Sequence, residues 1–126
     1  MDLEIHFVHT YLDGSLGAVI GVFFDREEGG DGDNLFLEQL NAIFSTAAGN
    51  TRTNQKISVE GFLDSLNTKD FWSYDGSLTT PPCTEGIKWS VLKAVQPISQ
   101  VQLDKYTALW AGNAAYAEGK GNNRVV

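Results

Sequence analysis

The stretch FWSYDGSLTTPPCTEGIKWSVLK, residues 71–93, predicts two β-strands joined by a stiff turn. FWSYDGS (71–77) has the pattern of a short aromatic strand ending in turn residues, and IKWSVLKAV (87–95) alternates like a half-buried strand. Between them, SLTTPPC (77–83) places two threonines before two prolines, whose fixed φ stiffens the backbone. Such a turn can hold a hydroxyl and an N–H beside a reacting centre. Taken alone, however, it is more simply a rigid turn.

Two further strands are expected nearer the N-terminus, at residues 2–9 and 17–24. In the first, alternation would put its apolar odd-numbered residues on a core and Glu4, His6 and Val8 together on the opposite face. A carboxylate can accept the second ring N–H of a metal-bound histidine, so Glu4 and His6 form a candidate ligand pair. Spacing alone favours the simpler interpretation of a half-exposed strand with a polar face.

Helices are expected as connections between the strands. NLFLEQLNAIFSTAA (34–48) carries apolar residues at helical spacing, and Asp33 or Asn34 could cap its start. Ser99 with Gln102 forms a capping-box pattern that opens a second helix. Strands therefore outnumber helices, and the expected fold class is α+β and β-rich.

Composition is typical of a globular domain and excludes several classes of partner. The 126 residues, 42% hydrophobic and 20% charged, suffice for one domain with a modest core. A net charge of −7 argues against nucleic acid, because proteins that bind it present a basic face. No apolar run approaches the ~20 residues of a membrane-spanning helix. The single cysteine, Cys83, is either a buried thiol or half of a disulfide to a cysteine outside this chain.

Four segments together resemble the α-class carbonic anhydrases. They are LEIHFVH (3–9), GAVIGVFF (17–24), the opening stretch at 71–93 and GNNR (121–124), and their order matches that family over nearly the whole chain. The resemblance implies part of a large, mostly antiparallel twisted sheet with short connecting helices. It also implies the family's reaction, the reversible hydration of CO2 to bicarbonate and a proton, with zinc as cofactor.

The resemblance gives the N-terminal strand a metal-binding role. His6 is similar to the family's third zinc ligand, and Glu4 to the carboxylate that hydrogen-bonds this ligand. Asn122 resembles a residue whose backbone carbonyl orients another zinc-binding histidine. His9 would point to the other face of the strand and is left out of the metal site.

The turn at 77–83 and the strand faces gain substrate-handling roles from the same resemblance. Thr79 resembles the threonine whose hydroxyl accepts a hydrogen bond from zinc-bound hydroxide, and Thr80 lines the same wall. Cys83 resembles a cysteine that many secreted and periplasmic members pair with one near the start of the domain, which suggests a secreted, periplasmic or organelle-lumen location. The apolar CO2 pocket is represented by Val8, Val19, Leu78, Ile87 and Trp89.

Several residues that the family's site requires have no counterpart in this sequence. The family's other two ligands form a His-x-His pattern, whereas this chain has two histidines at another spacing. We therefore expect residues 1–126 to be the C-terminal part of a single α-carbonic anhydrase domain. The expected site holds one zinc, with two histidine ligands from residues upstream or from a complementing chain. Because one histidine cannot replace three, the chain alone is expected to be inactive, and its unpaired strand edges invite pairing.

Two alternatives stay open at the level of the sequence. The chain could be a non-catalytic relative kept as a structural or binding module in a larger assembly, or a gene fragment without function. The presence of Glu4, His6, Thr79 and Trp89 favours an active parent domain, because a non-catalytic scaffold would not need that chemistry.

Overall fold

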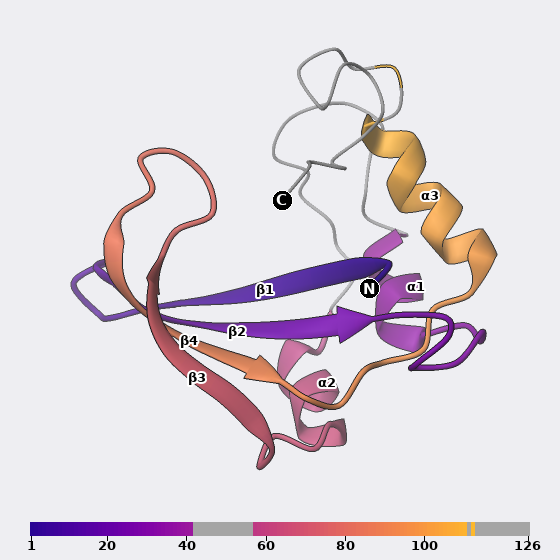
Figure 1. Cartoon of the computed structure of the whole chain (residues 1–126), viewed down its shortest axis with the longest axis horizontal. Coiled ribbons are helices and arrows are strands. Elements are labelled where there is room, and N and C mark those ends of the chain that lie inside the picture. The colour runs from indigo at the N-terminus through magenta and orange to yellow at the C-terminus, as the bar shows by residue number, and fades with distance from the viewer. Residues whose placement is uncertain (42–56, 111, 113–126) are drawn as a thin grey trace.

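The computed structural model describes residues 1–41, 57–110 and 112 of the chain. This part forms a four-stranded sheet and three short helices (Figure 1). In chain order the elements are β1 (Leu3–Thr10), β2 (Leu16–Phe24), α1 (Leu35–Asn41), α2 (Val59–Ser65), β3 (Phe71–Ser77), β4 (Glu85–Leu92) and α3 (Gln100–Trp110). None of the described helices is long and apolar enough to cross a membrane.

The sheet has the strand order β1-β2-β4-β3, so β1 and β3 are its two edges. The outer pairs, β1 with β2 and β3 with β4, are antiparallel, and the central pair, β2 with β4, is parallel. The expected β-rich α+β fold with a mostly antiparallel sheet is thus confirmed. The chain passes from β2 through α1, α2 and β3 before it reaches β4, and a long connection of this kind is what parallel neighbours require.

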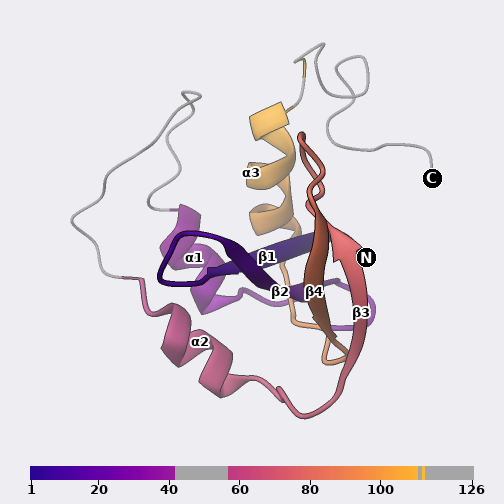
Figure 2. The same ribbon diagram turned by 90° about the vertical axis from the view of Figure 1, so that its left-hand side faces the viewer.

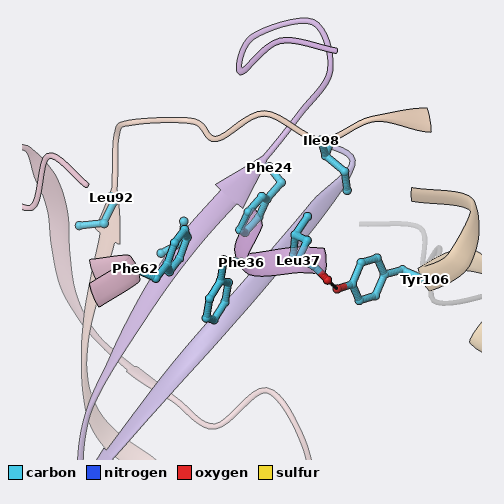
Figure 3. Close-up of a cluster of buried hydrophobic side chains, with 8 residues drawn as sticks. Phe24, Phe36, Leu37, Phe62, Leu92, Ile98 and Tyr106 are labelled. Carbon is cyan, nitrogen blue, oxygen red and sulfur yellow. Dashed lines mark hydrogen bonds between the residues drawn. The ribbon is translucent and has the colours of Figure 1, made fainter. Parts of the chain in front are cut away.

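One face of the sheet, here called the helix-covered face, carries the larger core. Helices α1 and α2 lie on this side of the sheet (Figure 2). Phe36 of α1 and Phe62 of α2 stack with ring centroids 4.0 Å apart and planes 6° from parallel, and Phe24 of β2 lies beside them (Figure 3). Because side chains alternate along a strand, the partly buried Leu3, Ile5 and Phe7 of β1 pack against the same cluster. The buried members are Val22, Phe24, Phe36, Leu37, Phe62, Leu92, Ile98 and Tyr106.

The starts of α1 and α3 are tied to one another by side-chain hydrogen bonds. Asn34 caps α1, since its Oδ1 accepts from the N–H of Phe36 at 3.0 Å. Ser99 Oγ accepts from the N–H of Gln102 at 3.3 Å, which is half of the expected capping box. The Gln102 side chain does not close that box. It instead bonds both the N–H and the C=O of Asn34, each at 2.9 Å.

The sequence-based element boundaries are partly confirmed. The strand at 71–77 matches β3, whereas β4 begins two residues earlier and ends three residues earlier than the expected 87–95. The expected helix at 34–48 is confirmed as far as Asn41, and its remainder lies outside the described residues. Helix α2 was not expected. It begins after Ser58, whose Oγ accepts from the N–H of Gly61 at 3.0 Å, and it buries Phe62.

Candidate functional site

The second face of the sheet, here called the His6 face, collects most of the residues singled out from the sequence. Strand register aligns them in two neighbouring rows across the sheet. Val8 of β1 stands opposite Val19, Val19 opposite Trp89, and Trp89 opposite Tyr74. The adjacent row runs from His6 through Gly21 and Val91 to Trp72.

A histidine–carboxylate pair lies on the edge strand of this face. Nε2 of His6 is 3.0 Å from Oε1 of Glu4, and the two side chains are 29% and 35% exposed. With Nε2 turned to the carboxylate, Nδ1 is the ring nitrogen left to act as a metal donor. Gly21 makes this seat possible, because a Cβ there would stand 3.0 Å from Oε1 of Glu4.

The indole of Trp89 forms the wall beside the imidazole. The His6 and Trp89 rings meet edge to face, with centroids 4.7 Å apart and planes at 83°. Trp89 is fixed in turn, since its Nε1–H donates to the Ser77 carbonyl at 3.0 Å and Tyr74 stacks on its other side at 6.0 Å. A Cβ at Gly76 would stand 3.0 Å from the indole, so a larger residue there would crowd the ring. The imidazole is thus held on two sides before any ligand binds.

The five expected pocket residues share this face but not the same degree of burial. Val19, Ile87 and Trp89 are buried in one small cluster with Val91, and Leu78 packs against it. Val8 is 52% exposed and therefore lies at an open margin. Two surface hollows of about 210 and 190 Å³ lie elsewhere, between α1 and α2 and beside His9 and Lys88. Neither of them is lined by His6 or Thr79.

Thr79, Thr80 and Cys83 lie in the β3–β4 loop, which rises from one end of the sheet (Figure 1). The loop is closed by two backbone bonds, from the N–H of Leu78 to the Thr84 carbonyl and from the N–H of Cys83 to the Thr80 carbonyl, both 2.9 Å. Both threonines and Cys83 are exposed, and Cys83 is a free thiol with a φ of 56°. Of the two alternatives for Cys83, a buried thiol is therefore wrong. Asn122 lies outside the described residues.

The described residues supply one imidazole to the His6 face and fall short of a complete metal site. No group of three or more histidine, cysteine or acidic side chains suited to a metal ion occurs among residues 1–41, 57–110 and 112. His9 is exposed, and its Nδ1 lies 3.0 Å from the Phe7 carbonyl, so it does not join His6. His6 can supply one of the ligands of a zinc ion, whereas a catalytic zinc needs three protein ligands.

Three features of this site were not found from the sequence. They are Gly21 beneath Glu4, Gly76 beside Trp89, and Tyr74 stacked on the indole. A glycine inside a run of β-branched and aromatic residues, as in VIGVFF, is the signal that could have identified Gly21, since it marks a close approach of other atoms.

Comparison with known proteins places the chain in a family. The family model described as "Eukaryotic-type carbonic anhydrase" matches residues 1–125. The chain belongs to this carbonic anhydrase family. "Alpha carbonic anhydrase 4" of Arabidopsis thaliana is 41% identical over 106 residues, covering 81% of this chain and 36% of the relative. The carbonic anhydrase of Klebsiella pneumoniae is 35% identical over 126 residues, covering 98% of this chain and 45% of the relative.

Solved carbonic anhydrase structures have the same fold over the aligned part. The α-carbonic anhydrase of Thermovibrio ammonificans, in complex with the inhibitor sulfanilamide, has a TM-score of 0.70 at 36% identity and covers 84% of this chain and 44% of that one. Dioscorin complexed with ascorbate has a TM-score of 0.60 at 29% identity, over 81% of this chain and 41% of that one. The chain therefore spans less than half the length of these relatives.

Proposed function

We propose that residues 1–126 form the C-terminal part of a single α-carbonic anhydrase domain, and that the complete domain catalyses the reversible hydration of CO2 to bicarbonate and a proton. The observation that carries this proposal is how the His6 ring is held by Glu4 and Trp89. Its Nε2 faces Glu4 at 3.0 Å and its ring edge meets Trp89, which leaves Nδ1 directed away from the carboxylate. A neutral histidine oriented by a carboxylate is the arrangement that zinc sites use to fix a ligand's tautomer.

In the complete domain, His6 would be one of three histidine ligands, and Glu4 would hold its ring. The other two ligands would come from residues not in this chain, either joined to it or in a complementing chain, and the Asn122 carbonyl would orient one of them. A zinc ion with three protein ligands and one open position supplies a nucleophile at neutral pH, because it lowers the pKa of bound water to about 7.

The remaining residues would place the substrate. CO2 is apolar, so an apolar wall can bind it, and the charged product does not compete for the same wall. We assign that wall to Val8, Val19, Leu78, Ile87 and Trp89. Of these, Val19, Ile87 and Trp89 are buried in one cluster, and the Trp89 ring contacts His6. The Thr79 hydroxyl would accept a hydrogen bond from the attacking hydroxide and fix its direction, which contributes by positioning, and Thr80 would line the same wall.

The chain by itself would be inactive, because its described residues bring one zinc donor to this face. The test is zinc content per chain in size-separated material, followed by stopped-flow CO2 hydration. We expect the monomer to hold far less than one zinc and to show no zinc-dependent hydration. In a longer protein that adds the missing segment, we expect one zinc per chain and full activity. His6→Asn should abolish both properties there, whereas His9→Asn, the matched control on the opposite face, should preserve them. Zinc-dependent hydration by the pure monomer would contradict the proposal.

A non-catalytic binding module is the second candidate function. It is favoured by the likeness to dioscorin, whose structure was determined with ascorbate. Equilibrium dialysis of the longer protein with ascorbate, together with a CO2 hydration assay of the same protein loaded with zinc, separates the two. Saturable binding together with absent CO2 hydration would support the module, and hydration that depends on His6 would exclude it as the main role.

A further inference from the structure

Three aspartates in the chain are followed directly by glycine, and this dipeptide is chemically labile. They are Asp13-Gly14, Asp31-Gly32 and Asp75-Gly76. The main-chain nitrogen of the second residue can attack Cγ of the aspartate, and glycine, which has no side chain, shields that nitrogen least. Because the three dipeptides are identical in sequence, the folded structure determines which of them reacts.

Asp31 is the least restrained of the three aspartates. It is an exposed residue in the loop between β2 and α1. Its carboxylate makes neither a hydrogen bond nor an ion pair with any residue in the described part of the chain. A Cβ built on Gly32 would meet no atom within 4 Å, so the space around the attacking nitrogen is open. The N–H of Gly32 bonds the nearby Gly30 carbonyl, at 3.1 Å, which ties it to no other element.

The turn between β1 and β2 holds the carboxylate of Asp13 in place. Its Oδ1 accepts hydrogen bonds from the Ser15 hydroxyl at 2.6 Å and from the Ser15 N–H at 2.8 Å. These bonds keep the pKa of Asp13 below its usual 3.8, because they stabilise the charged form. The Gly14 N–H is engaged as well, since it donates to the Tyr11 carbonyl at 2.9 Å. Attack at Asp13 must therefore break bonds that Asp31 does not have.

Strand geometry and an ion pair protect Asp75. The residue lies in β3, and in a strand the side chains stand perpendicular to the sheet while the N–H groups lie in its plane. The Gly76 nitrogen is therefore kept away from Cγ of Asp75. Lys88, which stands opposite Asp75 on β4, pairs with its carboxylate. Attack at this site requires the strand to open first.

We propose that Asp31-Gly32 is the main site among the three at which the folded chain isomerises spontaneously, through a cyclic imide, to isoaspartate. The Gly32 nitrogen forms a bond to Cγ of Asp31 and loses its proton. One carboxylate oxygen leaves as water, with that proton and a second proton from solvent. Water then adds to the imide and breaks one of its two C–N bonds. Breaking the bond to Cγ restores aspartate, whereas breaking the bond to the main-chain carbonyl carbon leaves isoaspartate, whose main chain runs through Cβ and Cγ.

The extra main-chain carbon of isoaspartate would fall between two anchors of the loop. On one side, the Gly30 carbonyl accepts from the N–H of Ile98 at 3.2 Å, and Ile98 is fully buried in the core. On the other side, Oδ1 of Asp33 accepts from the Ser99 hydroxyl at 2.5 Å. Both anchors join the loop to the segment that precedes α3. A longer main chain between them should therefore loosen this connection.

The test follows oxygen exchange at each aspartate of the full chain. Ring opening by water enriched in ¹⁸O leaves a heavy oxygen at the aspartate that reacted, and peptide mass spectrometry locates it. In the folded chain at neutral pH, label should enter Asp31 about tenfold faster than Asp13, because a charge-assisted hydrogen bond must first break at Asp13. Labelling of Asp75 should be slow as well. In concentrated urea the three sites should react at similar rates, since the protecting contacts are lost.

A second measurement examines the isomerised chain. Electron-transfer fragmentation should identify isoaspartate at position 31, and chromatography should separate that fraction from the parent chain. In the isomerised fraction, amide exchange of Ile98 should become severalfold faster, because its hydrogen bond to Gly30 opens more often. Unchanged exchange at Ile98 would refute the loosening of the loop.

Two variants separate the contributions of the two turns. Gly32→Ala should slow labelling at Asp31 severalfold, because the added Cβ crowds the attacking nitrogen, and the open space around it should leave the fold unchanged. Ser15→Ala should make labelling at Asp13 severalfold faster and leave Asp31 unchanged, because it removes one of the two bonds that hold the Asp13 carboxylate. The proposal is overturned if Asp13 or Asp75 reacts as fast as Asp31 in the folded chain. It is also overturned if the preference for Asp31 persists in urea, or if Gly32→Ala leaves the rate unchanged.

Discussion

Replacing Gly21 with alanine should detach Glu4 from His6 and leave the fold intact. An added Cβ would stand 3.0 Å from Oε1 of Glu4 and 3.3 Å from Cγ2 of Val91. The Glu4 side chain is 35% exposed and can swing into water, whereas Val91 is buried in the sheet centre and has little freedom. The carboxylate is therefore expected to move, and with it the hydrogen-bond partner of Nε2.

The expected change in the free energy of unfolding is small, because each of three contributions is small and one of them opposes the other two. The contact between the partly exposed Glu4 and His6 is worth no more than ~1 kcal/mol. Crowding Val91 by a few tenths of an ångström adds roughly 1 kcal/mol. Alanine recovers about 0.5–1 kcal/mol relative to glycine within a strand. The net loss is then about 1 kcal/mol, while the orientation of the imidazole is lost.

The assay follows both quantities in one protein. Urea unfolding monitored by tryptophan fluorescence gives the stability, and the ¹⁵N chemical shifts of the His6 ring give the tautomer. We expect one dominant tautomer in the parent chain and a mixture in Gly21→Ala. Gly32→Ala is the matched control, because a Cβ at Gly32 meets no atom within 4 Å. A single tautomer retained in Gly21→Ala, or a stability loss above about 3 kcal/mol, would refute the reasoning.

Three further predictions concern the core, a buried hydrogen-bond bridge and acid stability. Phe62→Ala should lower the free energy of unfolding, measured with urea, by about 3–5 kcal/mol, because the ring is stacked in the aromatic core. Val59→Ala on the same helix, at a residue that is 40% exposed, should change this free energy by less than about 0.5 kcal/mol. Gln102→Ala should lower the free energy of unfolding by about 1–3 kcal/mol, because the N–H and C=O of Asn34 at the start of α1 would lose their hydrogen-bond partner. The control Gln100→Ala, at an exposed residue of α3, should stay near neutral. Equal effects of the two variants in the same unfolding assay would contradict the bridge. The backbone N–H of Glu28 holds the pKa of Asp25 below its usual 3.8, so the stability from this carboxylate is present above pH 3.8 and lost as pH falls through the lower folded value. Asp25→Asn should therefore flatten the acid limb of a stability–pH curve, and an unchanged limb would exclude this origin.

Features of the site that depend on one strand could be predicted from the sequence, and features that depend on two could not. Alternation along residues 3–9 is enough to place Glu4 beside His6 and away from His9, and the structure has this arrangement. That Gly21 lies beneath the pair depends on the register of β1 against β2, which no single strand encodes.

Two errors in the helices have the same physical origin. Helix α2 has weak local signals, with a glycine at position 61, and it is held by burial of Phe62 against the sheet. Gln102 has the right spacing for a capping box, but the backbone of Asn34, 68 residues away, is a better partner because it is buried. In both places tertiary packing outweighs the local preference.

The two faces of the sheet differ in how completely they are covered. The helix-covered face is packed against α1 and α2 and their stacked rings. The His6 face has a buried centre, but Val8, Tyr74 and Trp72 at its flanks are 52%, 51% and 55% exposed. One oriented imidazole lies in this open margin, and Glu4 and Trp89 already restrict its rotation, which lowers the ordering cost of binding. In the proposed complete domain, a zinc ion bound by His6 would need two further ligands from residues outside this chain. By linkage, zinc would then stabilise the complete domain by about 1.4 kcal/mol for each tenfold rise in free zinc above the dissociation constant.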